Sequence, residues 1–169
     1  ARVSLLQSQL SVDSLGIAFL KAKGYQETRH FYNMRVQFDA PPAEPVLPEG
    51  VTIRSMAEGE ERALFHTSWE AFKDHWGMTP TTFESYYERW MHRIQTDPEF
   101  DRTLWFGAWD GDDVAGICYN KLKMVEDPEM AWVNTLGVRR QWRSKGLGLA
   151  LLLHSFGEFY KRGKRKAGL

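Results

Sequence analysis

The chain has a single cysteine and no long hydrophobic run. The one thiol among its 169 residues, Cys118, excludes an intramolecular disulfide framework and a cysteine-rich zinc site. We expect this thiol to fill a strand rather than to react. No apolar run approaches the roughly 18 residues of a membrane span, and the N-terminus has no signal-peptide pattern. The sequence therefore predicts a cytoplasmic protein with no membrane partner.

The chain also lacks net charge, but the two signs are separated along it. Residues 139–169 carry nine Lys and Arg and one acid, whereas residues 44–130 carry 18 acids and eight bases. This separation predicts an anionic ligand near the basic segment. Because the rest of the chain is acidic, we do not expect that ligand to be a nucleic acid.

A proline-rich stretch divides the sequence. Residues 39–50 contain four prolines, which neither continue a helix nor pair in a central strand, so we interpret them as a linker. Residues 1–38 are predicted as strand, helix and strand, with the helix capped by Asp13 and ended by Gly24. Residues 51–169 predict the order β-α-α-β-β-β-α. That order is typical of an α+β fold on a mostly antiparallel sheet.

The segment between the last predicted strand and the last predicted helix combines glycines with cations. Gly146 and Gly148 stand one residue apart at the start of an apolar helix. Four cations precede them, namely Arg139, Arg140, Arg143 and Lys145. A helix start offers unpaired N–H groups and partial positive charge, and glycine lets a bulky anion approach closely. The segment predicts a phosphate-binding turn; the alternative is that the glycines only allow tight helix–strand packing.

This segment resembles the acetyl-CoA-binding motif of the GNAT acyltransferase superfamily. The family motif, Gln/Arg-x-x-Gly-x-Gly/Ala, is met by residues 143–148, and the element order of residues 51–169 matches the family's fold. The resemblance implies a mixed, mostly antiparallel sheet flanked by helices. It also implies acetyl-CoA, or another acyl-CoA, as cosubstrate, and no metal.

The resemblance assigns cofactor-binding roles to ten residues. The strand residues Leu136, Gly137 and Val138 would offer backbone groups to the pantetheine arm, with an N–H near Leu136 or Val138 facing the thioester oxygen. The pyrophosphate would lie on N–H groups of the turn and helix start, with added charge from Arg143 and Lys145. These turn and helix residues are Arg143, Ser144, Lys145, Gly146, Leu147, Gly148 and Leu149.

The N-terminal segment resembles the other end of a GNAT domain. Residues 13–25, DSLGIAFLKAKGY, fit the spacing of the family pattern Asn-x-x-Ala-x-x-Leu-Tyr-x-x-x-Gly-Phe. Residues 1–38 therefore look like the tail of one GNAT domain and residues 51–169 like the head of another, as in tandem proteins of the kind that includes mycothiol synthase. One departure is Leu20, because many family members have at this position a tyrosine that protonates the departing thiolate.

The two pieces leave three arrangements open. They could belong to successive domains of a tandem protein, or build one domain in permuted order within the chain. They could also pair between two chains, as a homodimer or with a second GNAT domain. A linker of a dozen residues could span up to ~40 Å if extended, so closure within one chain is compatible with its length.

Two residues are candidates for the chemistry at the acceptor side. His75 falls in the loop between the first two predicted helices, which in this fold lines the acceptor pocket, and its imidazole could serve as base. The alternative, an ordinary loop histidine, is the interpretation that a single histidine in a loop favours. Asn134, on the strand before the motif, could orient a water or the substrate.

These features lead to two hypotheses. The first is an N-acetyltransferase of the EC 2.3.1 class that moves an acetyl group from acetyl-CoA to an amine, either a small molecule or a peptide. The second is a catalytically silent CoA-binding or scaffold domain of a tandem GNAT protein, which the leucine at position 20 favours.

Overall fold

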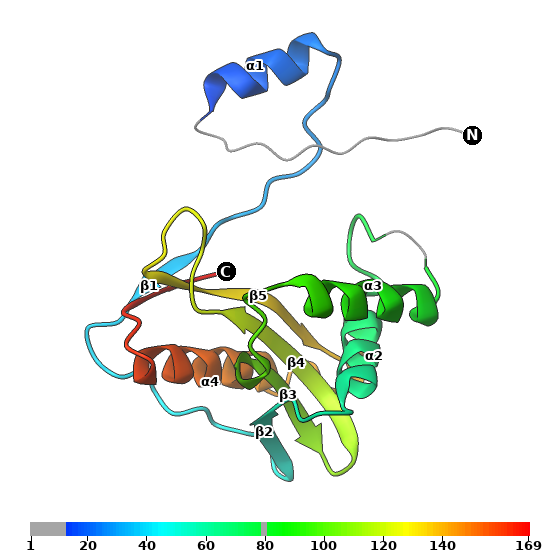
Figure 1. The fold of residues 1–169 in the computed structure, drawn as a ribbon, viewed down its shortest axis with the longest axis vertical. Coiled ribbons are helices and arrows are strands. Elements are labelled where there is room, and N and C mark those ends of the chain that lie inside the picture. Colours follow the sequence, from blue (N-terminus) through cyan, green and yellow to red (C-terminus); the bar gives the residue numbers. More distant parts are fainter. Residues whose placement is uncertain (1–12, 79–80) are drawn as a thin grey trace. The chain divides into compact units, whose positions relative to one another are not determined.

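The structure, a computed structural model, describes residues 13–78 and 81–169 (Figure 1). They fall into two units, residues 1–32 and residues 33–169, each described by itself below. The first predicted strand of the N-terminal segment lies outside the described residues. The helix that follows is confirmed as α1 (Ser14–Ala22).

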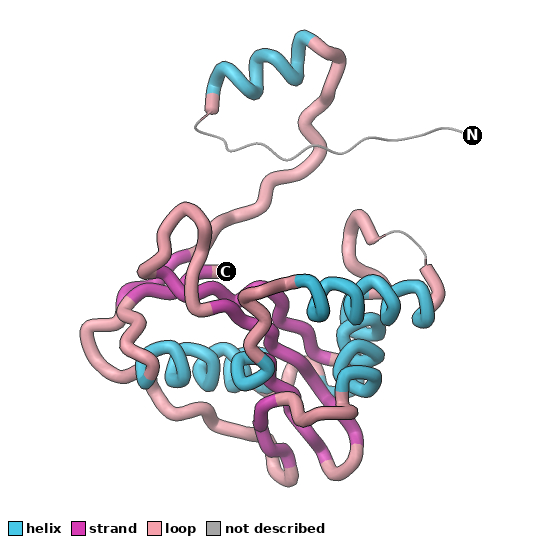
Figure 2. The backbone as a smooth tube through the Cα atoms, viewed as in Figure 1, coloured by secondary structure: helices cyan, strands magenta, loops and turns pink. Residues whose placement is uncertain are grey.

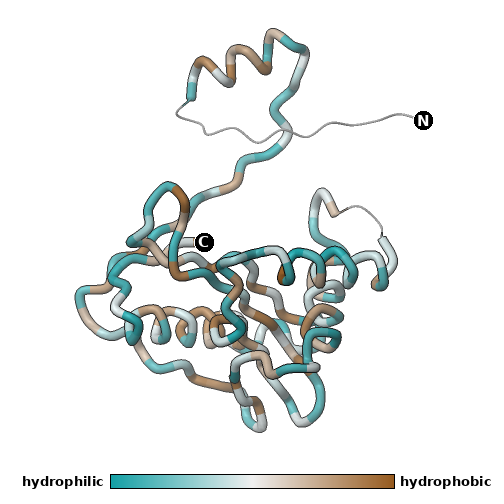
Figure 3. Tube along the Cα trace, in the orientation of Figure 1, coloured by the Kyte–Doolittle hydropathy of each residue, from teal (hydrophilic) through white to brown (hydrophobic). Residues whose placement is uncertain are grey.

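Helix α1 has the ends that the sequence predicts. The Asp13 carboxylate accepts the N–H of Gly16 at 2.9 Å, which satisfies one free donor of the first turn. The chain leaves the helix through Gly24, whose φ of +85° suits a residue without a Cβ. Hydrophobic positions run along α1 (Figure 3), and the side chains of Leu15 and Phe19 are 83% and 61% exposed.

The second unit is built on one six-stranded sheet. Its order is β1-β6-β5-β4-β3-β2, and every neighbouring pair is antiparallel except β5 and β6. The strands are β1 (Arg35–Gln37), β2 (Val51–Ser55), β3 (Trp105–Asp110), β4 (Asp113–Lys121), β5 (Met130–Val138) and β6 (Lys166–Gly168). The helices are α2 (Glu61–Phe72), α3 (Phe83–Thr96) and α4 (Leu147–Lys161), with short 3-10 turns η1 (Arg102–Leu104) and η2 (Arg140–Trp142). The predicted order after the linker is confirmed.

The strand before the linker is much shorter than the sequence predicts. A long strand, or two, is expected within residues 25–38, but the strand of the structure spans only Arg35–Gln37, with backbone hydrogen bonds continuing at Met34 and Phe38. The N–H groups of Met34 and Phe38 donate to the carbonyls of Leu169 and Arg165, so this pairing runs from Met34 to Phe38, whereas residues 25–33 belong to no strand of the structure. Residues 39–50 form a loop without helix or strand, as predicted (Figure 2).

The linker joins the two outermost strands of the sheet, β1 and β2. Phe38, at its start, packs against Phe156 of α4 with a ring separation of 5.2 Å. Pairing of β1 with β6 within the chain thus places residues on both sides of the linker in one sheet. The assignment of residues 1–38 to the tail of one domain and of residues 51–169 to the head of another stays a prediction.

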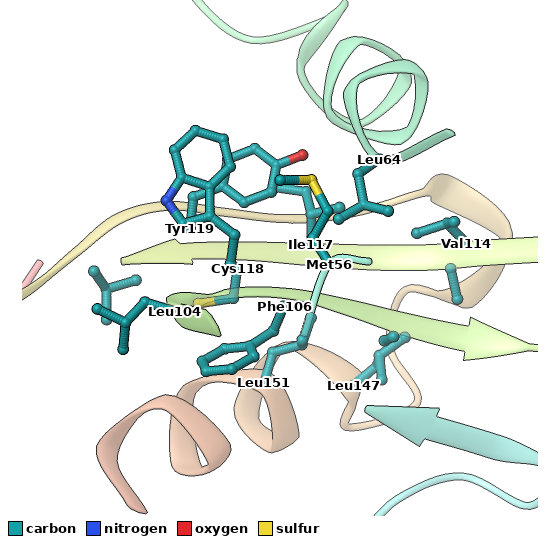
Figure 4. Close-up of a cluster of buried hydrophobic side chains, with 14 of the residues drawn as sticks. Met56, Leu64, Leu104, Phe106, Val114, Ile117, Cys118, Tyr119, Leu147 and Leu151 are labelled. Carbon is teal, nitrogen blue, oxygen red and sulfur yellow. The ribbon is translucent and has the colours of Figure 1, made fainter. Parts of the chain in front are cut away.

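Helices cover both faces of the sheet. In Figure 4, Leu64 of α2 lies on one side of β4, while Leu147 and Leu151 of α4 lie on the other. Successive residues of a strand point to opposite faces. On the α2 side Tyr119 stacks on Trp105 at 4.2 Å, whereas on the α4 side the Cys118 thiol lies 3.1 Å from the Ser155 hydroxyl. Packing of α4 on this face places the N-terminal end of α4 beside the C-terminal end of β5, where Gly148 lies next to Leu136 and Val138.

Candidate functional site

Strand β5 leaves the sheet open along half of its length. It pairs with β4 as far as Val138, but with β6 only from Met130 to Trp132. Beyond Trp132 no other strand in the described part of the chain covers that side of β5. The free edge of β5 runs from residue 133 to residue 138 and includes Leu136, Gly137 and Val138, whose role toward the pantetheine arm stays a prediction.

The backbone alternation decides which groups face the open edge. The N–H of Arg139 donates to the carbonyl of Ala115 at 3.0 Å, so Arg139 and, two residues earlier, Gly137 direct their backbone groups to the β4 side. Leu136 and Val138 therefore direct theirs to the open side. The carbonyl of Val138 there accepts the Arg143 Nε–H at 2.9 Å, which leaves the two N–H groups for a ligand.

A bulge lies near the start of this edge. Tyr119 pairs with Thr135 and Asn120 pairs with Val133, so Asn134 is an extra residue in β5. Its exposed side chain donates to the Thr135 hydroxyl at 3.3 Å and borders a small pocket beside α3, with room for about one water molecule. The pocket is lined by Trp90, Arg93, Ile94, Asp97, Trp105, Tyr119, Asn120, Lys121 and Asn134.

The turn between β5 and α4 has an unusual backbone. Ser144 has a φ of 61° and Gly146, the N-cap of α4, has a φ of 80°. In the described part of the chain, the N–H groups of residues 144–149 make no backbone hydrogen bond; the first that does is Ala150, to the carbonyl of Gly146. Successive free N–H groups around left-handed residues form a concave site for anions, here at the positive end of a helix.

The two glycines of the turn have different surroundings. A Cβ on Gly146 would meet nothing within 4 Å, so the space in front of this residue is open. A Cβ on Gly148 would lie 3.8 Å from Leu136 and 3.9 Å from Val138, both ordinary contacts. Gly148 therefore faces the free edge of β5, while Gly146 faces solvent. Leu147 is buried and anchors the helix, and Leu149 is 62% exposed.

The four cations near the turn are not equally available. Arg143 Nη2 donates to the carbonyl of Ala71 at 2.9 Å, so this side chain ties the end of α2 to the turn. Arg140 forms an ion pair with Asp74, and Arg139 lies 3.5 Å from Asp113. Lys145 alone among the four has no hydrogen bond or ion pair with the residues the structure describes.

The end of α2 also packs directly on β5. A Cβ on Gly137 would lie 2.8 Å from the Phe72 ring and 3.0 Å from the Ala71 Cβ, so only glycine lets the helix come this close. The sequence contains no sign of this contact or of the Asp74 ion pair. Both join segments about 65 residues apart, and a single aspartate in a polar loop has no distinguishing pattern.

The two candidate catalytic residues lie on separate elements. His75 follows α2, where its Nδ1 lies 2.9 Å from the carbonyl of Trp76 and its ring lies 5.7 Å from that of Phe72. Asn134 lies on β5, and no hydrogen bond or ring contact in the described part of the chain joins the two. Leu20 lies in α1, in the other unit. The catalytic assignment of His75 and Asn134 stays a prediction.

The described residues offer neither a metal-binding cluster nor a helix that could span a membrane. They contain no cluster of three or more His, Cys, Asp or Glu side chains that could hold a metal ion. None of their helices is both long enough and apolar enough to cross a bilayer.

Comparison with known proteins relates this architecture to one family. Residues 62–169 match the profile of the Acetyltransferase (GNAT) family. A protein of Streptomyces scabiei named mycothiol acetyltransferase is 34% identical over 128 residues, 75% of this chain and 39% of that protein. A protein of the same name from Geodermatophilus obscurus is 34% identical over 134 residues, 76% of this chain and 42% of that protein. The chain thus spans less than half the length of these relatives.

Solved structures give the same result for the fold. A GCN5-related N-acetyltransferase from Sphaerobacter thermophilus is 33% identical with a TM-score of 0.75, covering 94% of this chain and 47% of that one. A GNAT family acetyltransferase from Brucella melitensis, in complex with acetyl-CoA, has a TM-score of 0.53 at 13% identity. It covers 69% of this chain and 73% of its own, a likeness of fold alone.

Proposed function

The chain belongs to the GNAT acetyltransferase family, and from this premise we propose that it transfers an acetyl group from acetyl-CoA to an amine. The family corresponds to the EC 2.3.1 class of transferases. The fold predicted from the sequence agrees with this family: the described residues form a mixed sheet flanked by helices, in which β5 and β6 are parallel.

The turn before α4 is the observation that carries the proposal. Free N–H groups of residues 144–149, two left-handed residues and open space in front of Gly146 together form a site for a pyrophosphate. The N–H groups of Leu136 and Val138 continue this row of donors along β5. An extended ligand with phosphates at one end and amides at the other fits this layout, and coenzyme A has that chemistry.

The thioester would supply the electrophilic carbonyl carbon. The residues of the chain would stabilise the developing negative charge and remove a proton from the amine. As an amine formed its bond to that carbon and the C–S bond broke, releasing CoA as its thiolate, the N–H of Leu136 or Val138 would stabilise the negative charge on the carbonyl oxygen. The attacking amine has to lose a proton, for which we propose His75, with Asn134 orienting the amine or a water beside the bulge. Both would act from the α2 side of the sheet.

The acceptor is a small-molecule or peptide amine. The names of the relatives from Streptomyces scabiei and Geodermatophilus obscurus connect those proteins with mycothiol. We therefore propose amines related to mycothiol as the first acceptors to test. Because these relatives are more than twice as long as the aligned region, we also propose that the chain works beside a second GNAT domain.

A second candidate is a CoA-binding domain without turnover. Leu20 favours it, because this side chain cannot return a proton to the departing thiolate where the family pattern has a tyrosine. In that case the turn would bind the nucleotide as firmly, but no thiol would be released.

Thiol release separates the two candidates. The 169-residue chain is mixed with acetyl-CoA and a panel of amines, and free CoA thiol is followed with a disulfide reagent, while calorimetry measures CoA binding. Release that depends on one amine class supports the transferase. Binding without release for every amine supports the silent domain, and absence of CoA binding refutes both.

A further inference from the structure

Two arginines converge on one carboxylate oxygen beside the turn. Arg140 donates from Nε to Asp74 Oδ2 at 3.2 Å and also from Nη2, and Arg143 Nη1 lies 3.8 Å from the same oxygen. The Arg140 guanidinium lowers the pKa of Asp74, so the carboxylate is charged at neutral pH. Asp74 is thus an anion of the chain itself, held at the place where the turn begins.

The two arginines differ in what else holds them. Arg143 donates to the carbonyls of Val138 and Ala71, both at 2.9 Å, so its side chain is fixed between β5 and the end of α2. The Arg140 side chain has Asp74 as its only hydrogen-bond and ion-pair partner among the described residues. Arg140 could therefore change partners without breaking any other contact of this kind.

Asp74 belongs to the segment that carries His75. After α2 the chain forms two turns, with the N–H of His75 donating to the carbonyl of Phe72 at 2.9 Å and the N–H of Met78 to that of His75 at 3.1 Å. The side chain of Asp74 attaches this segment to η2. Any ligand that takes Arg140 away from Asp74 removes both hydrogen bonds of this attachment and leaves only the longer 3.8 Å contact with Arg143.

We propose that Asp74 competes with a phosphate group of the nucleotide for Arg140, so that nucleotide binding releases residues 73–78. The inference rests on the proposed function, which places phosphates on the adjacent turn. A guanidinium binds a phosphate through two parallel hydrogen bonds, and a phosphate carries more charge than one carboxylate. The segment next to the acceptor side thereby responds to occupancy of the cofactor turn.

Asp74→Asn tests the competition, because it keeps the shape of the side chain and removes its charge. Exposed ion pairs are weak, so we expect CoA to bind the variant about two- to fivefold more tightly than the unchanged chain. Acetyl-pantetheine, which has no phosphate, should bind both equally. Asp113→Asn, which removes the partner of Arg139, serves as the matched control and should leave CoA affinity unchanged.

Hydrogen exchange tests the release. In the unchanged chain, CoA should speed exchange of the amides of His75 and Met78. In Asp74→Asn these amides should exchange fast already, with little response to CoA. Adding Arg140→Gln to Asp74→Asn should abolish the gain in CoA affinity, because the residue for which the two anions compete is gone.

The outcomes separate this inference from the proposed function. If the unchanged chain binds CoA but Asp74→Asn binds it no more tightly, or if CoA leaves exchange at residues 73–78 unchanged or slower, the competition is refuted and the transferase proposal stands. If the unchanged chain does not bind CoA at all, both are wrong.

Discussion

Glutamate at position 146 should remove nucleotide binding while leaving the fold intact. Gly146 has a φ of 80° and open space around it, so a longer side chain fits but projects a negative charge over the free N–H groups. A hydrogen bond to a charged group contributes about 1.5–3 kcal/mol, and losing two of them costs about 3–6 kcal/mol. Affinity for CoA should therefore fall by about a hundredfold to ten-thousandfold.

The other end of the same helix provides a matched control. Gly163 follows α4 with a φ of 85°, and a Cβ added to it would also meet nothing within 4 Å. Gly163→Glu adds the same charge and similar backbone strain, about 1–2 kcal/mol in each variant. In a chain of this size that strain lowers Tm by about 2–8 °C, measured by thermal unfolding. Calorimetry with CoA should distinguish the two variants; equal affinity in two folded proteins would disprove the phosphate site.

Three further positions of the second unit can be tested by substitution or labelling. Gly137→Ala should destabilise the fold by about 1–3 kcal/mol in urea unfolding, because its Cβ would lie 2.8 Å from the Phe72 ring. Gly157→Ala, in open space on α4, serves as the control and should not destabilise the fold in this way. A smaller residue at position 72 should restore part of the stability that Gly137→Ala loses. Burial lowers the pKa of His154, so as the pH falls the unfolded chain binds a proton at this residue before the folded chain does. The free energy of unfolding should therefore decrease as the pH drops below about 6.5. His154→Leu should lose less of this free energy below pH ~6.5 and should show the same pH dependence as the unchanged chain above it. Burial raises the pKa of the Cys118 thiol to about 12, so a thiol reagent should label this residue only after unfolding; rapid labelling of the folded chain would contradict the core described here.

Helix caps and turns can be predicted from the sequence, because the residues that form them are neighbours in the chain. Asp13 accepts an N–H group of the first turn of α1, as the sequence indicates, because a cap needs only residues three positions apart. The turn at residues 143–149 is predictable for the same reason. Its glycines, its cations and the apolar helix after it are adjacent in sequence. The family resemblance then supplies the chemistry that a turn alone does not.

Features that depend on distant partners could not be predicted. The aromatic, β-rich residues before the linker favour a long strand, yet only those next to the linker pair, and their partner is the C-terminal segment, far away in the sequence. The motif also predicts Arg143 as a charge for the phosphates. In the structure its guanidinium holds the carbonyls of Val138 and Ala71, which places the end of α2 against the turn. The end of α2 and the turn before α4 are therefore joined by a residue of the motif itself.

The bulge at Asn134 determines what the free edge of β5 presents. Side chains alternate between the faces of a strand, so one extra residue reverses the face of every residue after it. With Asn134 in place, Gly137 faces α2 and allows its close approach, while the side chains of Leu136 and Val138 face Gly148 of α4. Without it, Leu136 and Val138 would point at the helix that now packs on Gly137, where a Cβ already has no room. The extra residue thus lets β5 pack on α2 with one face and on the start of α4 with the other. The same register sets the position of the Leu136 and Val138 N–H groups, which we propose bind the thioester.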